Sequence, residues 1–270
     1  ALPVIIGSIY FAPLGLLFVL LASAAMMVGL YEFWVLSSRV QMKAMRELGT
    51  LFAVVFLLAF YFQIPSVAPE LLALVSAAFV VSTLAAAMLR GESFEKMLPS
   101  AGATVVGVLY VVFLGGHVVA LRTSFPMPLA RHLLFFFLLV LMGSDTAAYY
   151  TGRALGRHKL APKVSPGKTW EGAAGGMLAS LAAAALARYW FFDEISLRAA
   201  LPLAAVMNVV GVLGDLTESA MKRGAGAKDA ASILPGHGGL LDRLDSLLFN
   251  APLIYYFAAY YFHASLLKPW

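Results

Sequence analysis

Three aspartates and several basic residues lie in the most polar stretch of the chain, residues 214–246. Asp242 and Asp245 are three residues apart, so a helix would present both on one face. Asp215 opens the same stretch at the end of an apolar run, and we expect the three carboxylates to converge where two helices meet. Oxygen ligands of this kind suit Mg²⁺ or Mn²⁺, which bind substrate phosphates. Three carboxylates also carry enough charge for a second cation.

Basic and small residues of this stretch suit the phosphates that such a metal would bind. A helix that carries Asp215 also places Ser219 and Lys222 on the same face. The other basic candidates are Arg223, Lys228 and Arg243. Glycines let the backbone approach a phosphate closely, and here they are residues 224, 226, 236, 238 and 239. His237 suits a phosphate contact, a general base or a turn cap. The alternative interpretation is a solvated loop whose carboxylates only neutralise the bases.

A second polar cluster lies just before the apolar run at residues 172–191 and contains Ser165, Lys168 and Thr169. A turn rich in Ser, Thr and Lys that leads into a helix N-terminus suits an anion. The Gly-Lys-Thr run at 167–169 resembles the end of a P-loop, but Pro162 stands where that motif needs glycine. No strand pattern precedes the run either, so a P-loop is rejected. The alternative is a basic loop with a helix cap at Ser165 or Thr169.

The composition indicates that membrane-spanning helices position these clusters. Hydrophobic residues make up 61% of the 270 residues and charged residues only 12%, against about 25% in a soluble domain. This excludes a soluble domain, a disordered chain and a fibrous repeat. Without cysteine there is no disulfide, thiolate zinc site or cysteine nucleophile. The net charge of +5 fits basic loops against anionic headgroups or substrates, not nucleic acid. We expect an all-α, polytopic integral membrane protein.

Eight stretches are long and apolar enough for helices that cross the membrane, which takes about 20 residues each. They are residues 13–36, 48–64, 66–89, 98–121, 132–151, 172–191, 199–214 and 244–262. The first twelve residues are apolar too, and would form a re-entrant or interfacial helix or a ninth span. The prediction is therefore eight to nine transmembrane helices.

The lysines and arginines predict the orientation of these spans. Most of the 19 fall in four segments that share one side of the membrane, namely 39–47, 90–97, 152–171 and 215–243. The positive-inside rule places that side in the cytoplasm. The candidate site would then face the cytoplasm from an integral membrane protein, which would lie in the plasma or inner membrane if the protein is bacterial.

The chain divides unevenly between scaffold and chemistry. Residues 1–130 form apolar spans with chemically plain loops, and their first three spans could also bury a homodimer contact. Residues 131–270 hold nearly all the candidate chemistry, in the loops 152–171 and 215–243. Glu32 lies beside aromatic residues, and we interpret it as part of a belt at the membrane interface.

The polar stretch resembles the signature of the phosphatidate cytidylyltransferases, also called CDP-diacylglycerol synthases. The matching residues are Ser219-Ala-Met-Lys222-Arg223, Lys228-Asp229, Pro235-Gly-His237-Gly238-Gly239 and Asp242-Arg243-Leu-Asp245. The loop Ser165-Pro-Gly-Lys168-Thr169-Trp-Glu-Gly is similar to a second family stretch. Gly167 departs from it, since a lysine is frequent there, and one phosphate contact is thereby lost. The resemblance implies an integral membrane enzyme that joins CTP to phosphatidic acid, releases pyrophosphate and uses a divalent metal.

The resemblance and the residue types together assign the site residues. The catalytic set comprises Asp215, Asp242, Asp245, Lys222, Arg223, Lys228 and His237. The set that binds substrate phosphates comprises Ser165, Lys168, Thr169, Ser219, Gly238, Gly239 and Arg243. The metal ligands are Asp215, Asp242 and Asp245. Asp145 keeps three open roles, which are to hold a metal, to bind the cytidine or to pair with Arg153.

Three other functions compete with this interpretation. A CDP-alcohol phosphotransferase also uses clustered aspartates, but its Asp-Gly-x-x-Ala-Arg pattern is missing. A CTP-dependent lipid kinase would release CDP instead of pyrophosphate. An ion or lipid transporter would need charges near the bilayer midplane, whereas Asp215 and Asp242 are expected near the cytoplasmic surface. The expected partners are therefore CTP, phosphatidic acid and membrane lipids.

Overall fold

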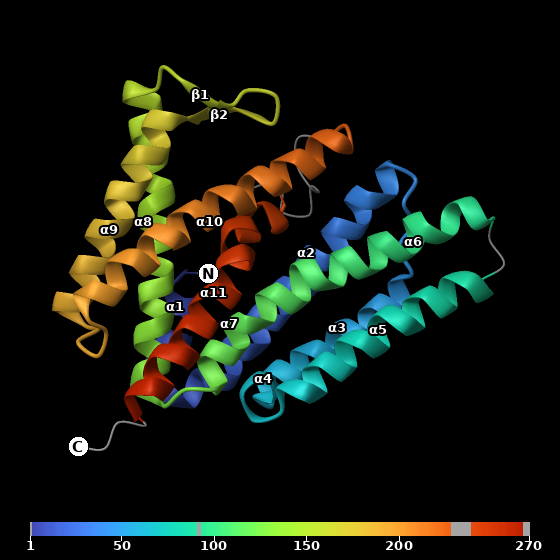
Figure 1. Ribbon diagram of the computed structural model, residues 1–270, viewed down its shortest axis with the longest axis horizontal. Helices are drawn as coiled ribbons and strands as arrows, with labels where there is room; N and C mark the ends of the chain where they lie inside the picture. The colour runs from blue at the N-terminus through green and yellow to red at the C-terminus, as the bar shows by residue number, and fades with distance from the viewer. Residues whose placement is uncertain (1, 91–92, 228–238, 267–270) are drawn as a thin grey trace. The chain divides into compact units, whose positions relative to one another are not determined.

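The structure is a computed structural model that describes residues 2–90, 93–227 and 239–266 (Figure 1). It divides into two compact units that we describe separately. Unit 1 comprises Ala1–Ser124 and Lys222–Leu244, and unit 2 comprises Phe125–Met221 and Asp245–Trp270. Two of the three boundaries fall inside the long helices Leu197–Gly224 and Leu241–Leu266, so each of these helices contributes residues to both units.

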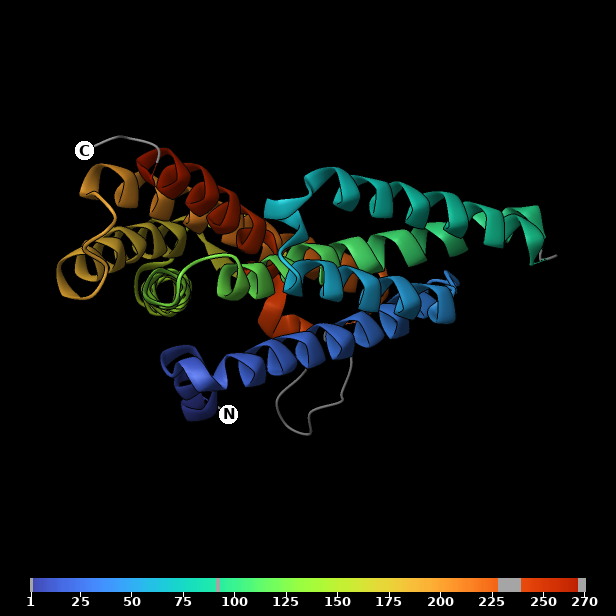
Figure 2. The ribbon, with the colours of Figure 1, turned by 90° about the horizontal axis from the view of Figure 1, so that it is seen from below.

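Unit 1 is built from helices because its apolar segments must satisfy their backbone hydrogen bonds internally in a bilayer. Its principal helices are α1 (Leu2–Tyr10), α2 (Gly15–Arg39), α3 (Arg46–Tyr61), α5 (Pro69–Leu89), α6 (Phe94–Gly107) and α7 (Leu114–Thr123). Short elements join them, namely the 3₁₀ turn η1 (Ala12–Leu14), the one-turn helix α4 (Ile64–Val67) and the π-helical segment η2 (Val108–Phe113). Figure 2 shows α2 and α5 on opposite sides of this unit, with α3 and the α6–α7 segment between them.

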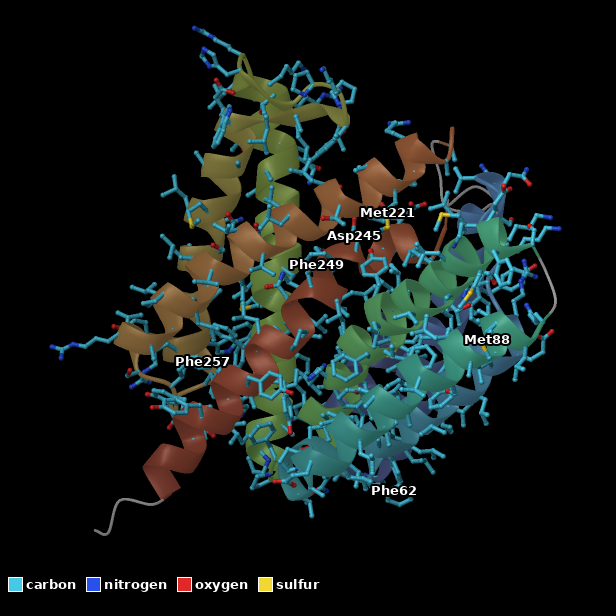
Figure 3. The ribbon with its side chains drawn as sticks, turned by 45° about the vertical axis from the view of Figure 1, so that its right-hand side comes forward. Phe62, Met88, Met221, Asp245, Phe249 and Phe257 are labelled. Carbon is cyan, nitrogen blue, oxygen red and sulfur yellow. The ribbon has the colours of Figure 1, made fainter. Side chains whose placement is uncertain are left out.

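Aromatic side chains form the core of unit 1. Phe56 packs edge-on against Phe79 of α5 and Phe113 of η2, with ring centroids 5.9 and 5.5 Å apart. Phe60, one turn further along α3, packs against Phe113 at 5.7 Å. Gly116 makes this packing feasible, because a Cβ there would collide with the Phe60 ring. Phe62 and Met88 mark opposite ends of the α3–α5 pair in Figure 3.

Unit 2 contains four long helices and a β-hairpin. They are α8 (Met127–Leu155), β1 (Lys159–Ala161), β2 (Ser165–Thr169), α9 (Trp170–Trp190), α10 (Leu197–Gly224) and α11 (Leu241–Leu266). Helices α8 and α9 lie side by side, with the hairpin at one end of the pair (Figure 1). Glycines allow this contact, because a Cβ at Gly172 would stand 2.8 Å from the Ala148 carbonyl oxygen and one at Gly176 3.1 Å from that of Ser144.

The prediction of an all-helical membrane protein is confirmed in its main feature. Each of the eight apolar stretches is largely helical, although some run past the end of one helix into the next, and five helical segments of the described residues are long and apolar enough to cross a membrane. These segments are Ala12–Arg39, Pro69–Leu89, Phe94–Thr123, Met127–Leu155 and Leu197–Gly224. The fold differs from the prediction in the loop 152–171, where β1 and β2 pair antiparallel. The strands are three and five residues long and lack an apolar alternation, so no strand pattern was recognisable there.

Candidate active site

Three carboxylates of unit 2 interact electrostatically, and we call Asp145, Asp215 and Asp245 the acidic group. They come from α8, α10 and α11, and each aspartate is repelled by the charge of at least one other. Asp145 is exposed, Asp215 is half-buried and Asp245 is only 8% exposed. The structure therefore brings together two of the three predicted metal ligands, Asp215 and Asp245, and adds Asp145.

Close packing of α10 against α11 positions Asp245. A Cβ added at Gly214 would stand 2.7 Å from the Asp245 carbonyl oxygen and 3.2 Å from the Phe249 side chain, so a larger residue would separate the helices. Figure 3 shows Asp245 and Phe249 one turn apart on α11 beside α10. The Asp245 Oδ1 accepts the backbone N–H of Ser246 at 2.6 Å. The Ser246 side chain in turn interacts favourably with the Asp145 carboxylate.

Lys168 of β2 is the base that the structure places against the acidic group. Its Nζ lies 2.6 Å from Asp215 Oδ2, with 24% of the lysine side chain and 38% of the aspartate side chain exposed. Its charge also acts on Asp145 and Asp245. Arg153, the predicted alternative partner of Asp145, donates to the Tyr149 hydroxyl at 3.2 Å. Among the described residues, three carboxylates thus face one ammonium, which leaves excess negative charge.

The hairpin holds Lys168 in this place. Thr169 ends β2 and caps α9, because its Oγ1 accepts the backbone N–H of Gly172 at 3.1 Å, as predicted for a cap at this position. Ser165 pairs with Ala161 across the hairpin. Of the three residues of this loop predicted to bind phosphate, Lys168 is the one that the structure joins to the acidic group.

A contact between His158 and Glu171 at the base of the hairpin stabilises the same segment. The His158 Nδ1 lies 2.6 Å from the Glu171 carboxylate, which also accepts the His158 backbone N–H at 3.2 Å. The bond from His158 lowers the pKa of Glu171 to about 2. Glu171 is in the first turn of α9, where a negative charge is favourable.

A layer of buried amides and hydroxyls accompanies the acidic group in unit 2, and sequence analysis missed it. The Asn208 side-chain amide donates to the Ser144 hydroxyl, one residue before Asp145. The Asn250 amide donates to the Ser246 carbonyl at 2.9 Å, one residue after Asp245. Single asparagines inside apolar runs were the available signal, since polar groups within spans are costly unless they have a role.

In unit 1, Asp242 forms an ion pair with Lys222 instead of standing free. Lys222 Nζ lies 2.6 Å from Asp242 Oδ1, and the two side chains are only 12% and 15% exposed. The other oxygen, Oδ2, accepts the backbone N–H of Gly239 at 2.9 Å. Gly239 was predicted to offer its backbone to a phosphate, but this N–H is already bound to Asp242.

The structure shows that the interpretation of Glu32 from the sequence was wrong. It was assigned to an interfacial belt, yet its side chain is completely buried. Its two oxygens accept the backbone N–H groups of Leu240 and Leu241 at 3.0 and 2.7 Å, at the start of α11. No local sequence pattern predicts this contact, because Glu32 is separated from its two partners by 208 and 209 positions in the sequence.

The remaining predicted residues have local contacts or lie outside the described residues. The Ser219 hydroxyl donates to Asp215 Oδ1 at 3.3 Å, one turn away on α10. Arg223 donates to the Ala227 carbonyl at 3.4 Å near the end of α10. Arg243 is exposed. Three predicted site residues, Lys228, His237 and Gly238, lie outside the described residues.

The donor set of the acidic group fits a hard divalent cation in its chemistry. Carboxylate oxygens are the preferred ligands of Mg²⁺ and Mn²⁺, and a cation would relieve the mutual repulsion of the three charges. As the side chains stand, no group of three or more His, Asp or Glu within the described ranges is arranged to hold a metal ion. Since Lys168 already neutralises Asp215 in part, a cation would compete with it.

Comparisons with known proteins identify relatives of this chain. The family model described as "Cytidylyltransferase family" matches residues 1–261. The chain is 44% identical over 129 residues to a phosphatidate cytidylyltransferase of Haemophilus influenzae, and 43% identical over 126 residues to one of Bacillus subtilis. A third, from Brucella suis, is 48% identical over 130 residues.

These alignments with single relatives are partial. They cover 46% of this chain and 44% of the Haemophilus protein, 47% of both chains for Bacillus, and 46% of both for Brucella. The chain thus spans a little under half the length of the curated relatives it matches.

Proposed function

Because the chain belongs to the cytidylyltransferase family, we propose that it transfers the cytidylyl group of CTP to phosphatidic acid. The products would be CDP-diacylglycerol and pyrophosphate, as the names of its relatives suggest. The observation that carries the proposal is the acidic group with Lys168, set on long apolar helices of unit 2. Such helices suit a lipid substrate, and the excess of carboxylates over bases suits the metal that a nucleoside triphosphate normally brings.

The proposed reaction needs little acid–base chemistry. An oxygen of the lipid phosphate attacks the α-phosphorus of CTP, the bond from that phosphorus to the bridging oxygen breaks, and pyrophosphate leaves with the electron pair. The phosphate nucleophile is already anionic at neutral pH. The barrier therefore comes mainly from repulsion between anions and from charge that develops on the leaving group, which positive groups offset.

The basic residues supply that positive charge in the proposal. Lys168 would exchange its bond to Asp215 for one to a substrate phosphate, and the ion pair with Asp242 would hold the Lys222 ammonium in one place. Arg223, Lys228, Ser165 and the glycines of the signature keep their predicted phosphate contacts as part of the proposal. His237 keeps its predicted role as a phosphate contact or base.

The metal belongs to the proposal as well. A Mg²⁺ or Mn²⁺ ion held by Asp215 and Asp245, with Asp145 beside them, would supply charge neutralisation for the triphosphate. Asp242 as a further ligand, and a second cation, stay predictions. Both oxygens of Asp242 already have partners, Lys222 and Gly239.

We further propose eight to nine spans, with the site at the cytoplasmic face. The basic hairpin loop supports this orientation, because Arg157, Lys159 and Lys163 are exposed there. A homodimer through the first spans of unit 1 remains part of the same proposal.

The test is pyrophosphate release by the purified chain in mixed micelles that contain phosphatidic acid, CTP and Mg²⁺. Each component is omitted in turn, and the lipid product is identified by mass spectrometry. We expect release that needs all three components, together with CDP-diacylglycerol. CDP with a newly phosphorylated lipid would instead identify a CTP-dependent kinase. Absence of pyrophosphate from folded, lipid-supplied protein would contradict the proposal.

A further inference from the structure

Glu32 makes an unusual contact for a residue in the middle of an apolar helix. Its carboxylate is fully buried in unit 1 and binds the backbone of α11 with both oxygens, Oε1 to Leu240 N–H and Oε2 to Leu241 N–H. Asp242 takes the neighbouring N–H, that of Gly239. Three successive N–H groups at the start of α11 are thus bound by two carboxylates.

This arrangement has a clear physical reason. The first N–H groups of a helix have no partner within the helix, and the helix dipole makes them favourable for a negative charge. A carboxylate in an apolar interior is costly unless such groups satisfy it. Bonds from a charged acceptor to backbone N–H groups are short and strong, and two of them fix both the position and the rotation of the turn they hold.

Helix α2 packs against this turn at Gly29, one turn before Glu32. A Cβ at Gly29 would stand 3.3 Å from Val111 and in ordinary van der Waals contact with Leu244 at 3.6 Å and Leu241 at 3.8 Å. The glycine and the glutamate therefore both face the first turn of α11.

The geometry excludes other roles for Glu32. A membrane-interface charge would be exposed, whereas this one is buried. A general base or a metal ligand would need an oxygen directed at substrate or metal, whereas both oxygens are bound to Leu240 and Leu241. What remains is control over the residue that follows immediately, Asp242.

We propose that Glu32 is a positioning residue, which holds the first turn of α11 so that Asp242 lies against Lys222. The ammonium of Lys222 is then fixed in direction by Asp242 at 2.6 Å. The link to catalysis rests on the proposed function, in which Lys222 binds a substrate phosphate. Glu32 itself contacts no reacting atom.

The principal variant is Glu32→Gln, which keeps the size of the side chain. It replaces one carboxylate oxygen by an NH₂ group, which cannot accept a hydrogen bond from a backbone N–H. The matched control is Glu47→Gln, the same chemical change in the same unit, where Glu47 forms only an exposed pair with Arg90 at 3.2 Å. A second control, Phe79→Leu, lowers stability in the α3–α5 core without touching α11. Glu32→Asp keeps the charge on a shorter side chain and should lie between wild type and Glu32→Gln.

Two readouts measure the contact without using activity. In Glu32→Gln, backbone amides of residues 239–244 should exchange hydrogen about 10- to 100-fold faster in detergent, as expected when a charge-assisted bond is lost. Lys222 should also be acylated faster by an amine reagent, measured by mass spectrometry relative to Lys96. Neither control should change either rate. Wild-type protection at residues 239–244, or unchanged Lys222 acylation, in folded Glu32→Gln would overturn the proposal.

The kinetic readout separates positioning from general stability. Glu32→Gln should lower kcat/KM for CTP about 10- to 100-fold, while KM for the lipid stays within about twofold. Phe79→Leu, with a similar loss of thermal stability, should keep wild-type kinetics. Wild-type kinetics in Glu32→Gln would overturn the positioning role. If wild type itself releases no pyrophosphate, the proposed function fails, and exchange and acylation still decide whether Glu32 positions Asp242.

Discussion

The acidic group of unit 2 and the first turn of α11 in unit 1 use carboxylates in opposite ways. In unit 1, Glu32 and Asp242 are buried or nearly so, and each oxygen has a partner of opposite charge or an N–H donor. In unit 2, Asp145 and Asp245 carry charges that repel one another and Asp215, and Lys168 offsets them only in part. Satisfied carboxylates stabilise structure, whereas crowded ones store repulsion that a ligand can relieve. In the proposed function, unit 2 would therefore hold the metal, whereas unit 1 positions the Lys222 ammonium.

The largest effect should follow from Asp245→Asn in the acidic group. The asparagine Oδ1 can still accept the Ser246 N–H, but one of three repelling charges is gone. We expect CTP-dependent pyrophosphate release to fall at least about 100-fold, with a melting temperature equal to or above that of wild type. The exposed Asp193→Asn in the same unit is the control. Activity retained within a few-fold would remove Asp245 from the site.

Asp242→Asn should lower the stability of the fold, in contrast to Asp245→Asn. It removes the charge of the Asp242 carboxylate from beside the Lys222 ammonium, which is only 12% exposed. We expect a loss of about 1–3 kcal/mol in unfolding free energy, measured by denaturation in detergent. The double variant Lys222→Met, Asp242→Leu should regain stability without activity, because an apolar pair of similar volume replaces the ions. A melting temperature of Asp242→Asn at or above that of wild type would show that this carboxylate does not stabilise the fold and would contradict the contrast with the acidic group.

Divalent cations should sharpen the contrast further. If the acidic group holds Mg²⁺, adding it at ten times its dissociation constant should stabilise the folded chain by about 1.4 kcal/mol. Asp245→Asn should lose this response, whereas Glu32→Gln should keep it. The measurement is thermal unfolding with Mg²⁺ against NaCl of equal ionic strength. An equal Mg²⁺ response in wild type and Asp245→Asn would place any bound metal elsewhere.

The smallest effect concerns the contact between His158 and Glu171 that supports the hairpin. The folded-state pKa of Glu171 is lowered to about 2 by its bond to His158, below the ordinary value of 4.5. A depressed carboxylate pKa stabilises the fold above the unfolded value and loses that contribution as the pH falls through the folded one. The difference in melting temperature between wild type and Glu171→Gln should therefore shrink as the pH falls from about 4.5 to 2. A difference that stays constant over this range would show that the bond does not control the charge of Glu171.

Local patterns in the sequence predicted much of the fold and part of the site. The apolar stretches gave helices at the expected places, because apolar length is a property of each segment alone. The cap at Thr169 was predictable in the same way, from a threonine before a helix. The meeting of Asp215 with Asp245 followed from their places at the ends of two neighbouring helices. The hairpin was missed, because its strands are short and polar.

Residue types and spacing by themselves thus determined the membrane class, the helices and the candidate chemistry, since these depend on neighbours within a few turns. Only the tertiary structure decided which carboxylates are satisfied and which are crowded. Glu32 reaches α11 across 208 residues, and Lys168 reaches Asp215 from a hairpin that no periodicity announced. Such contacts depend on how closely helices pack, as α10 and α11 do at Gly214, and that distance is a property of the packed fold.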